Sequence, residues 1–168
     1  MSAVISKCGR YRYELRRDVP PSPGSLPFAS GIRYLVMVML NPSTADASTD
    51  DPTIRRCIGL AARHAIPQLV VVNLFALRSS SPAVLTSHQE PSGPENDFYT
   101  RYWLRKEHAL VVAAWGAHPA TRSRVEWIRC VAREEAIPLY CLGITKAGHP
   151  RHPLYVPNAQ PLVRWQLA

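Results

Sequence analysis

The stretch Tyr34-Leu-Val-Met-Val-Met-Leu40, followed directly by Asn41-Pro-Ser-Thr-Ala-Asp46, decides the fold class of this chain. An apolar run rich in valine and methionine is typical of a strand that is buried on both faces, as in a parallel sheet. The run ends abruptly at Asn41-Pro42, which by itself could be no more than a turn. Because ligands of open parallel sheets bind at the carboxyl ends of the strands, the polar residues after Leu40 are the first candidates for a functional site.

Three more apolar runs of strand length follow, and each ends at an asparagine or just before a glycine. They are Gln68 to Asn73, Ala109 to Trp115 and Leu139 to Leu142. The segments between them carry apolar residues at helical spacing. Asp51-Pro52 predicts the start of the first helix, because aspartate caps a helix and proline suits its first position. That helix should end near Ala65, since Pro67 cannot continue it.

Two later segments complete the helical pattern. Residues 95–108 predict a helix with Phe98, Tyr102 and Leu104 on its buried side. Residues 119–136 predict a helix that buries Ile128 and its neighbours at helical spacing. Each predicted strand except the last is therefore followed by a helix.

The alternation of strands and helices predicts one α/β domain over residues 1–168, with right-handed crossovers. We expect three layers, α/β/α, around a central and mostly parallel sheet of four strands. Residues 1–30 should form an N-terminal strand, with arginines on one face, and a Pro-rich loop. Residues 31–168 should form the α/β core. Because the carboxyl ends of parallel strands share one edge, the residues behind the four strands should converge there.

Composition narrows the class of protein. The chain has 168 residues, which suits a single domain, and no stretch approaches the roughly 20 apolar residues of a membrane span. The N-terminus lacks the apolar core of a signal peptide, so we expect a cytoplasmic protein. The cysteines are far apart, which argues against a zinc ribbon and, in the cytosol, against disulfides. A net charge of +8, mostly from arginine, favours a polyanionic partner such as nucleic acid.

The side chains behind the predicted strands suit recognition of a nucleobase. Asn41 and Asn73 carry carboxamides, which can position a water molecule or read the edge of a base. Ser43 and Thr44 add small hydroxyl groups beside Asn41. The loop after the last strand gathers basic, imidazole and apolar side chains, namely Lys146, His149, Arg151, His152, Leu154 and Tyr155.

This last loop suits an anionic ligand better than a metal ion. A histidine can donate a hydrogen bond to a developing anion, and Lys146 and Arg151 can hold phosphates. Leu154 and Tyr155 can act as a wedge or as a stacking platform for bases. The histidines lack a convincing third ligand, so we expect neither a metal ion nor a cofactor. The chain also lacks the G-x-S-x-G, P-loop and dinucleotide-binding patterns, which disfavours serine hydrolases, NTPases and NAD enzymes.

Taken in order, these motifs resemble the uracil-DNA glycosylase superfamily over roughly residues 33–155. The chain has an apolar strand that ends in Asn-Pro, a second strand that ends in asparagine, a third that ends in Trp-Gly, and a late loop with His-Pro and Pro-Leu. The whole chain also resembles a bacterial family catalogued only as a domain of unknown function. The superfamily resemblance implies a glycosylase-like fold and a DNA substrate.

The resemblance also implies roles for single residues. Asn41 would position the hydrolytic water, and Asn73 would read the base. Leu154 would fill the space that a flipped base leaves in the stack. Trp115 and Gly116 match a structural landmark of the superfamily, so their implied role is packing.

Two departures from the superfamily pattern affect the catalytic assignment. The final His-Pro motif is one residue longer here, so His149 and His152 are both candidates for the histidine that faces the departing base. Asn41 cannot act as a general base and could only orient the water. Asp46 or Asp51 would have to supply a carboxylate.

Ser43 points to the class of substrate. Superfamily members that are strict for uracil carry a bulky tyrosine at this position, which blocks substituents at C5 of the base. A serine removes that barrier, so the predicted substrate is a C5-modified pyrimidine, for example a hypermodified base of phage DNA. The expected base contacts are Ser43, Thr44, Asn73 and Phe75. The expected DNA contacts are Lys146, Arg151, Leu154, Tyr155, Arg55 and Arg56.

The sequence therefore predicts a monofunctional DNA glycosylase that acts as a monomer on double-stranded DNA after base flipping. Repair and antiviral defence are both open as its biological role. Two alternatives use the same cleft: a hydrolase or transferase of free nucleotides or nucleosides, and a non-catalytic sensor of modified DNA. Turnover of free nucleotides would identify the first, and tight binding without base release the second.

Overall fold

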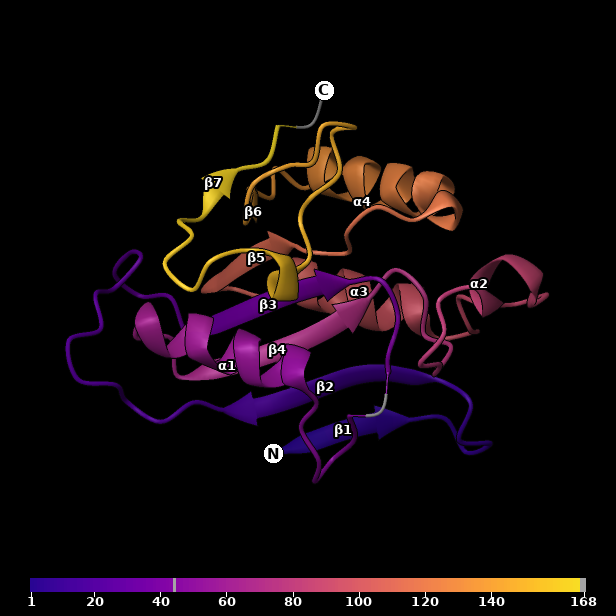
Figure 1. The fold of residues 1–168 in the computed structure, drawn as a ribbon, viewed down its shortest axis with the longest axis horizontal. Helices are drawn as coiled ribbons and strands as arrows, with labels where there is room; N and C mark the ends of the chain where they lie inside the picture. The colour runs from indigo at the N-terminus through magenta and orange to yellow at the C-terminus, as the bar shows by residue number, and fades with distance from the viewer. Residues whose placement is uncertain (44, 167–168) are drawn as a thin grey trace.

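A computed structural model describes residues 1–43 and 45–166, and within them the chain forms one mixed sheet with helices around it (Figure 1). The strands are β1 (Ser2–Ile5), β2 (Arg12–Asp18), β3 (Tyr34–Met39), β4 (Gln68–Asn73), β5 (Ala109–Ala113), β6 (Leu139–Cys141) and β7 (Val163–Arg164). The helices are α1 (Pro52–Arg63), α2 (Val84–Ser87), α3 (Asn96–Leu104) and α4 (Arg122–Glu134), with 3₁₀ turns η1 (Pro119–Thr121) and η2 (Pro153–Tyr155).

The sheet has the order β1-β2-β4-β3-β5-β6-β7. Strand β3 pairs in parallel with β4 on one side and with β5 on the other, and β6 pairs in parallel with β5. Strands β1, β2 and β7 pair antiparallel. The prediction of a four-stranded sheet is therefore wrong in size, because the described residues form seven strands. The extra strands lie at both edges, where short or charged segments lack the apolar run that marks a central strand.

The chain order of the parallel strands creates a switch point between β3 and β5. From β3 the chain passes through α1 to β4 on one side, and from β5 it passes through α4 to β6 on the other. In open α/β sheets, ligands bind outside the carboxyl ends of the strands at such a point. The topology therefore directs attention to the loops that follow β3 and β5.

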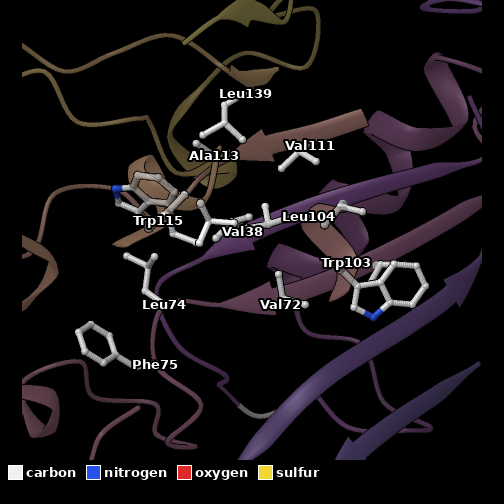
Figure 2. Packing of buried hydrophobic residues seen from close by; sticks show 14 of the residues in the cluster. Val38, Val72, Leu74, Phe75, Trp103, Leu104, Val111, Ala113, Trp115 and Leu139 are labelled. Atoms are coloured by element: carbon white, nitrogen blue, oxygen red, sulfur yellow. The ribbon is translucent and has the colours of Figure 1, made fainter. Parts of the chain in front are cut away.

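Helices cover both faces of the sheet, because side chains of a buried strand alternate between the faces. One face packs against α1 and contributes Leu35, Met37, Leu69 and Val112 to a core with Ile54, Cys57 and Leu60. The other face packs against α3 and α4. Figure 2 shows Val38, Val72, Val111 and Ala113 of that face in one hydrophobic cluster that also contains Trp103 and Leu104 of α3. In Figure 1, α1 lies in front of the sheet and α3 behind it.

The first helix begins as the sequence predicts. The Oδ1 atom of Asp51 accepts a hydrogen bond from the backbone N–H of Ile54 at 2.8 Å, and Pro52 occupies the first helical position. The helix ends at Arg63, and Ala65 then adopts a positive φ of 53°. Both ends are confirmed, since they depend only on local residues.

The predicted buried side of α3 is wrong for two of its three residues. Phe98 and Tyr102 are 69% and 46% exposed, whereas Leu104 is buried as predicted, together with Asn96, Thr100 and Trp103. The indole N–H of Trp103 donates to the buried Glu14 carboxylate of β2. A buried carboxylate needs a hydrogen-bond donor, and this tertiary contact turns the Trp103 side of the helix inward.

Strand β2 is more buried than the sequence predicts, and its arginines do not share one face. Its register with β1 shifts between Val4 and Ile5, so that Tyr13 is an extra residue opposite them. Tyr13 packs in the core on the side of α3, whereas Leu15 packs in the core on the side of α1. Such a bulge re-aims the side chains next to it, and here it turns Arg12 toward the α1 side of the sheet.

Candidate active site

A cavity of about 640 Å³ opens at the carboxyl ends of the parallel strands. Its walls contain Asn41 behind β3, Asn73 at the end of β4, Trp115 and Gly116 behind β5, and the loop after β6. The N-terminal turn of α1 closes one side through Asp51 and Thr53. The structure thus brings together residues from all four strand ends, at the switch point of the sheet. A cavity of this size accommodates a small organic ligand such as a nucleoside.

Asn73 is the most unusual residue of the cavity wall. Its side chain is 1% exposed, and neither its Oδ1 nor its Nδ2 atom has a hydrogen-bond partner. Most buried polar atoms in folded proteins are paired, because an unpaired one costs free energy. An amide that lines a cavity with both atoms unpaired is therefore arranged for a ligand that offers one donor and one acceptor.

The backbone around Asn73 is held in place by α3 and α4. The Nδ2 atom of Asn96 donates to the carbonyl oxygens of Asn73 and Leu74, at 3.0 and 3.1 Å. The Nε atom of Arg124 donates to the same Leu74 oxygen at 2.9 Å. Sequence reasoning missed Asn96, although an asparagine at the start of a helix is a common anchor for a neighbouring turn.

Asn41 is oriented by its own loop. Its Nδ2 atom donates to the carbonyl oxygens of Pro42 and Ser79, at 3.0 and 2.9 Å. The amide nitrogen is thereby engaged, which leaves Oδ1 as an acceptor for a water molecule or a ligand. Ser43 lines the cavity beside it. Thr44, which the sequence also predicts to contact a base, lies outside the described residues.

Phe75 does not line the cavity. The sequence predicts it as a base contact, but its side chain is 4% exposed and belongs to the hydrophobic core that α3 and α4 cover (Figure 2). It follows the end of β4, where the backbone N–H of Phe75 donates to the Leu40 carbonyl oxygen at 3.0 Å. The structure therefore gives it a packing position.

The structure separates the two candidate histidines. His152 lines the cavity, and its Nδ1 atom accepts a hydrogen bond from the backbone N–H of Leu154 at 3.3 Å. In the neutral ring the proton then sits on Nε2, which is free to donate to a ligand. Burial lowers the pKa of His152, and the charge of Asp51 only partly opposes this, so the neutral form is favoured. His149 instead lines a second cavity near Arg129 and Trp165.

Of the two candidate carboxylates, Asp51 is the one in the cavity wall. The Oδ1 atom of Asp46 accepts hydrogen bonds from the backbone N–H groups of Ser48 and Thr49, both at 2.9 Å, and from the Ser48 hydroxyl. These bonds lower the pKa of Asp46 and tie its carboxylate to its own loop. The structure does not bring Asp46 to the cavity lining.

The predicted DNA contacts divide into two groups. Lys146 and Arg151 are exposed and line the cavity, as does Tyr155, which is 79% exposed. Leu154 is 45% exposed and lines a neighbouring groove beside α1. Three of these four exposed side chains therefore line the cavity, and Leu154 lies in the neighbouring groove.

The arginines of α1 hold loops. Arg55 is exposed, and its Nη1 atom donates to the Asp50 carbonyl oxygen at 2.6 Å. Arg56 donates to the Val156 carbonyl oxygen, which joins α1 to the segment after η2. The sequence predicts both as DNA contacts, and the structure shows that Arg56 is engaged within the protein.

Arg12 and His118 are two of the cavity residues that were not predicted from the sequence. Arg12 is 2% exposed, and its Nη1 atom donates to the Ala45 carbonyl oxygen at 2.6 Å. His118 follows β5, and its Nδ1 atom accepts from the backbone N–H of Ala120 at 3.3 Å. The signal for His118 was its place two residues after Gly116, at a predicted strand end. Arg12 had no such signal, because it comes from an antiparallel strand.

Other kinds of site find less support in the structure. Within the described residues, no three His, Cys, Asp or Glu side chains lie close enough to hold a metal ion. Burial raises the pKa of Cys57 to about 12 and also raises that of Cys141, so neither is a thiolate nucleophile at neutral pH. None of the helices in residues 1–43 and 45–166 has the length and apolar character to cross a bilayer.

Fold and cavity together describe an α/β protein with a cavity at the carboxyl ends of its parallel strands, whose wall contains polar side chains. The chain belongs to the family described as "Protein of unknown function (DUF1643)", whose sequence model matches residues 12–154. That match begins at Arg12 and includes the cavity residues up to His152. No curated protein and no solved structure matches the chain.

Proposed function

We propose that this protein is a DNA glycosylase that hydrolyses the N-glycosidic bond of a C5-modified pyrimidine after flipping it from the duplex. The observation that carries the proposal is the unpaired, buried amide of Asn73 in a cavity that also holds His152 and the Oδ1 atom of Asn41. The resemblance to the uracil-DNA glycosylase superfamily suggests the same three roles for these residues.

The Asn73 amide matches the edge of a pyrimidine. Its Oδ1 can accept from N3–H and its Nδ2 can donate to O4 of a uracil-type base. Turned over by 180°, the same amide can donate to N3 and accept from the N4 amino group of a cytosine-type base. Either pairing satisfies both buried atoms of Asn73 at once.

Bond cleavage in this cavity can proceed by dissociation. The C1′–N1 bond breaks, and its electron pair leaves with the base, which becomes an anion. The Nε2–H group of neutral His152 donates a hydrogen bond to that anion, as preorganised donors do in other enzymes. The Oδ1 atom of Asn41 holds the water that attacks C1′, and the Asp51 carboxylate is in the cavity wall to take the proton that this water releases.

The opening of the cavity suits a DNA backbone. Lys146 and Arg151 are exposed there and can contact phosphates on either side of a flipped nucleotide. The exposed Leu154 of η2 can enter the stack in place of the base. Ser43 in the wall leaves space for a substituent on the base.

Base release from defined duplexes tests this function. Wild type, Asn41→Ala and the control Asn158→Ala are incubated with duplexes that carry uracil, 5-hydroxymethyl pyrimidines, or glycosylated pyrimidines. Asn158 is exposed and lies outside the cavity, so its replacement controls for loss of an asparagine as such. Free base and alkali-labile strand breaks are measured. We expect release from at least one C5-modified duplex by wild type and Asn158→Ala, and its loss in Asn41→Ala.

The same experiment separates the alternatives. Release of uracil without release of any 5-substituted pyrimidine would contradict the substrate class. Tight binding to modified duplexes without release of base would identify a sensor of modified DNA. Hydrolysis of free nucleotides or nucleosides, with duplexes untouched, would identify a metabolite enzyme.

A further inference from the structure

Two arginines of β2 are almost completely buried, and they differ in how their charges are compensated. Arg17 is 1% exposed, and its Nε atom donates to Asp50 Oδ1 at 2.7 Å while its Nη2 atom donates to the Asp46 carbonyl oxygen. Arg12 is 2% exposed and uses only Nη1, which donates to the Ala45 carbonyl oxygen. The Nε atom of Arg12 has no partner, and no ion pair of Arg12 is found in the described part of the chain.

A buried guanidinium without a counter-ion is costly, because it loses its hydration and gains no opposite charge. Burial lowers the pKa of Arg12 to about 10, which still leaves it charged at neutral pH. The charge of Asp51 in the same cavity wall opposes this pKa shift, but the two side chains do not form an ion pair. Among the described residues, the positive charge of Arg12 thus lacks the compensation that Arg17 has.

Arg12 lines the cavity from an almost completely buried position. The bulge at Tyr13 turns its side chain toward the wall that also contains Val71 and Asn73. Its backbone N–H donates to the Ala76 carbonyl oxygen at 2.9 Å, which holds β2 against the segment behind β4. Lys146, in contrast, is exposed. Backbone phosphates of a bound DNA would therefore meet the exposed opening, while the flipped base would meet Arg12.

We propose that Arg12 forms an anion subsite in the inner wall of the cavity and that the base accepted there carries an acidic substituent, such as a carboxylate. This inference rests on the proposed function, because it names the class of C5 substituent. The Nη1 atom of Arg12 is engaged with Ala45, so the unpaired Nε and the adjacent Nη2 form the edge that is left for a ligand. This edge can donate two parallel hydrogen bonds to one carboxylate.

Binding of free nucleosides tests the subsite without any need for base release. Calorimetry compares 5-carboxy-2′-deoxyuridine with its neutral isostere, 5-carbamoyl-2′-deoxyuridine. We expect wild type to bind the carboxylate about 10- to 100-fold more tightly, as for a hydrogen-bonded group of opposite charge. Arg12→Met should abolish this preference. Arg17→Met removes an equally buried arginine of the same strand from outside the cavity lining, and it should keep the preference.

Two results would overturn the anion subsite. One is equal binding of the two nucleosides by wild type, a comparison that needs no variant to fold. The other is a preference for the carboxylate that survives Arg12→Met. If instead 2′-deoxyuridine 5′-monophosphate binds tightly and loses affinity in Arg12→Met, Arg12 holds a phosphate and the acidic substituent is refuted.

Failure of the proposed function gives a different pattern. A carboxylate preference that depends on Arg12, combined with no base release from any duplex, supports the subsite and removes the glycosylase. Release of a neutral 5-substituted base, combined with no carboxylate preference, supports the glycosylase and overturns the subsite.

Discussion

Replacement of Asn73 by leucine should make the protein more stable and unable to recognise a base. Both amide atoms of Asn73 are buried without a hydrogen-bond partner. Each such atom costs about 1–3 kcal/mol relative to its hydrated state. Leucine has a similar size and no polar atoms, so Asn73→Leu removes both costs at one site.

The expected gain follows from these terms. Imperfect fit of the branched leucine offsets about 1–2 kcal/mol of the relief. The middle of these ranges, about 4 kcal/mol of relief less about 1.5 kcal/mol of offset, leaves a net stabilisation of about 2.5 kcal/mol. For a chain of this length, each kcal/mol raises Tm by about 2–4 °C, so the transition should shift upward by roughly 5–10 °C. Loss of both hydrogen bonds to the base should lower kcat/KM by about 10²–10⁴-fold.

Thermal unfolding followed by circular dichroism measures the first effect, and base release from a modified duplex measures the second. Asn96→Leu is the matched control, because Asn96 is equally buried and its Oδ1 atom is unpaired, but its Nδ2 atom donates to the Asn73 and Leu74 carbonyl oxygens. Loss of these two hydrogen bonds should outweigh the relief of one unpaired oxygen, so Asn96→Leu should lower the free energy of unfolding by about 1 kcal/mol. The two replacements are thus expected to have opposite signs.

A fall in Tm for Asn73→Leu would refute the reasoning, because it would mean that the Asn73 amide is satisfied within the folded protein. Unchanged base release in Asn73→Leu would refute the role of this amide in base recognition. A rise in Tm for Asn96→Leu would show that the hydrogen-bond pattern does not predict stability here.

Three further predictions concern the last loop and β2. Burial lowers the pKa of His152, so base release should keep its rate through the ordinary histidine range and slow only at more acidic pH, where the neutral donor is protonated; a rate–pH profile measures this. Stability should begin to fall earlier, as pH drops through the ordinary histidine pKa, because the unfolded chain binds the proton more readily. His152→Gln should reduce release by about 10²-fold. Arg17→Met should lower the free energy of unfolding in urea by about 2–4 kcal/mol, since it leaves Asp50 without its partner; a loss below 1 kcal/mol would contradict this. Leu154→Ala should slow release from duplexes about tenfold and leave release from single strands unchanged, whereas Leu26→Ala, exposed and outside the cavity, should change neither.

Much of the fold can be predicted from short stretches of the sequence. The apolar runs at β3 and β4 bury both faces of the sheet, and the Asp51-Pro52 pair begins α1 through contacts within one turn. Because such patterns act over a few residues, they can be read without knowing the rest of the chain. The position of Asn41 and Asn73 at one edge of the sheet follows in the same way, since parallel strands share their carboxyl ends.

Short sequence patterns did not predict the edge strands of the sheet or the buried side of α3. Strand β2 lacks an apolar run, and its place beside β4 depends on residues far apart in the chain. The buried side of α3 depends on the contact between Trp103 and Glu14 of β2. Helical periodicity alone favoured Phe98 and Tyr102, because it depends only on the spacing of apolar residues within the helix. It carries no information about a buried carboxylate on another strand.

The residues that line the cavity were likewise predicted only in part from the sequence. The sequence by itself determined that asparagines and a basic histidine loop lie at the strand ends. Only the tertiary structure decided that His152 rather than His149 lines the cavity, because the path of an irregular loop depends on what it packs against. Only the tertiary structure also placed Arg12 in the wall, because a one-residue bulge in β2 reverses the face that a strand side chain occupies.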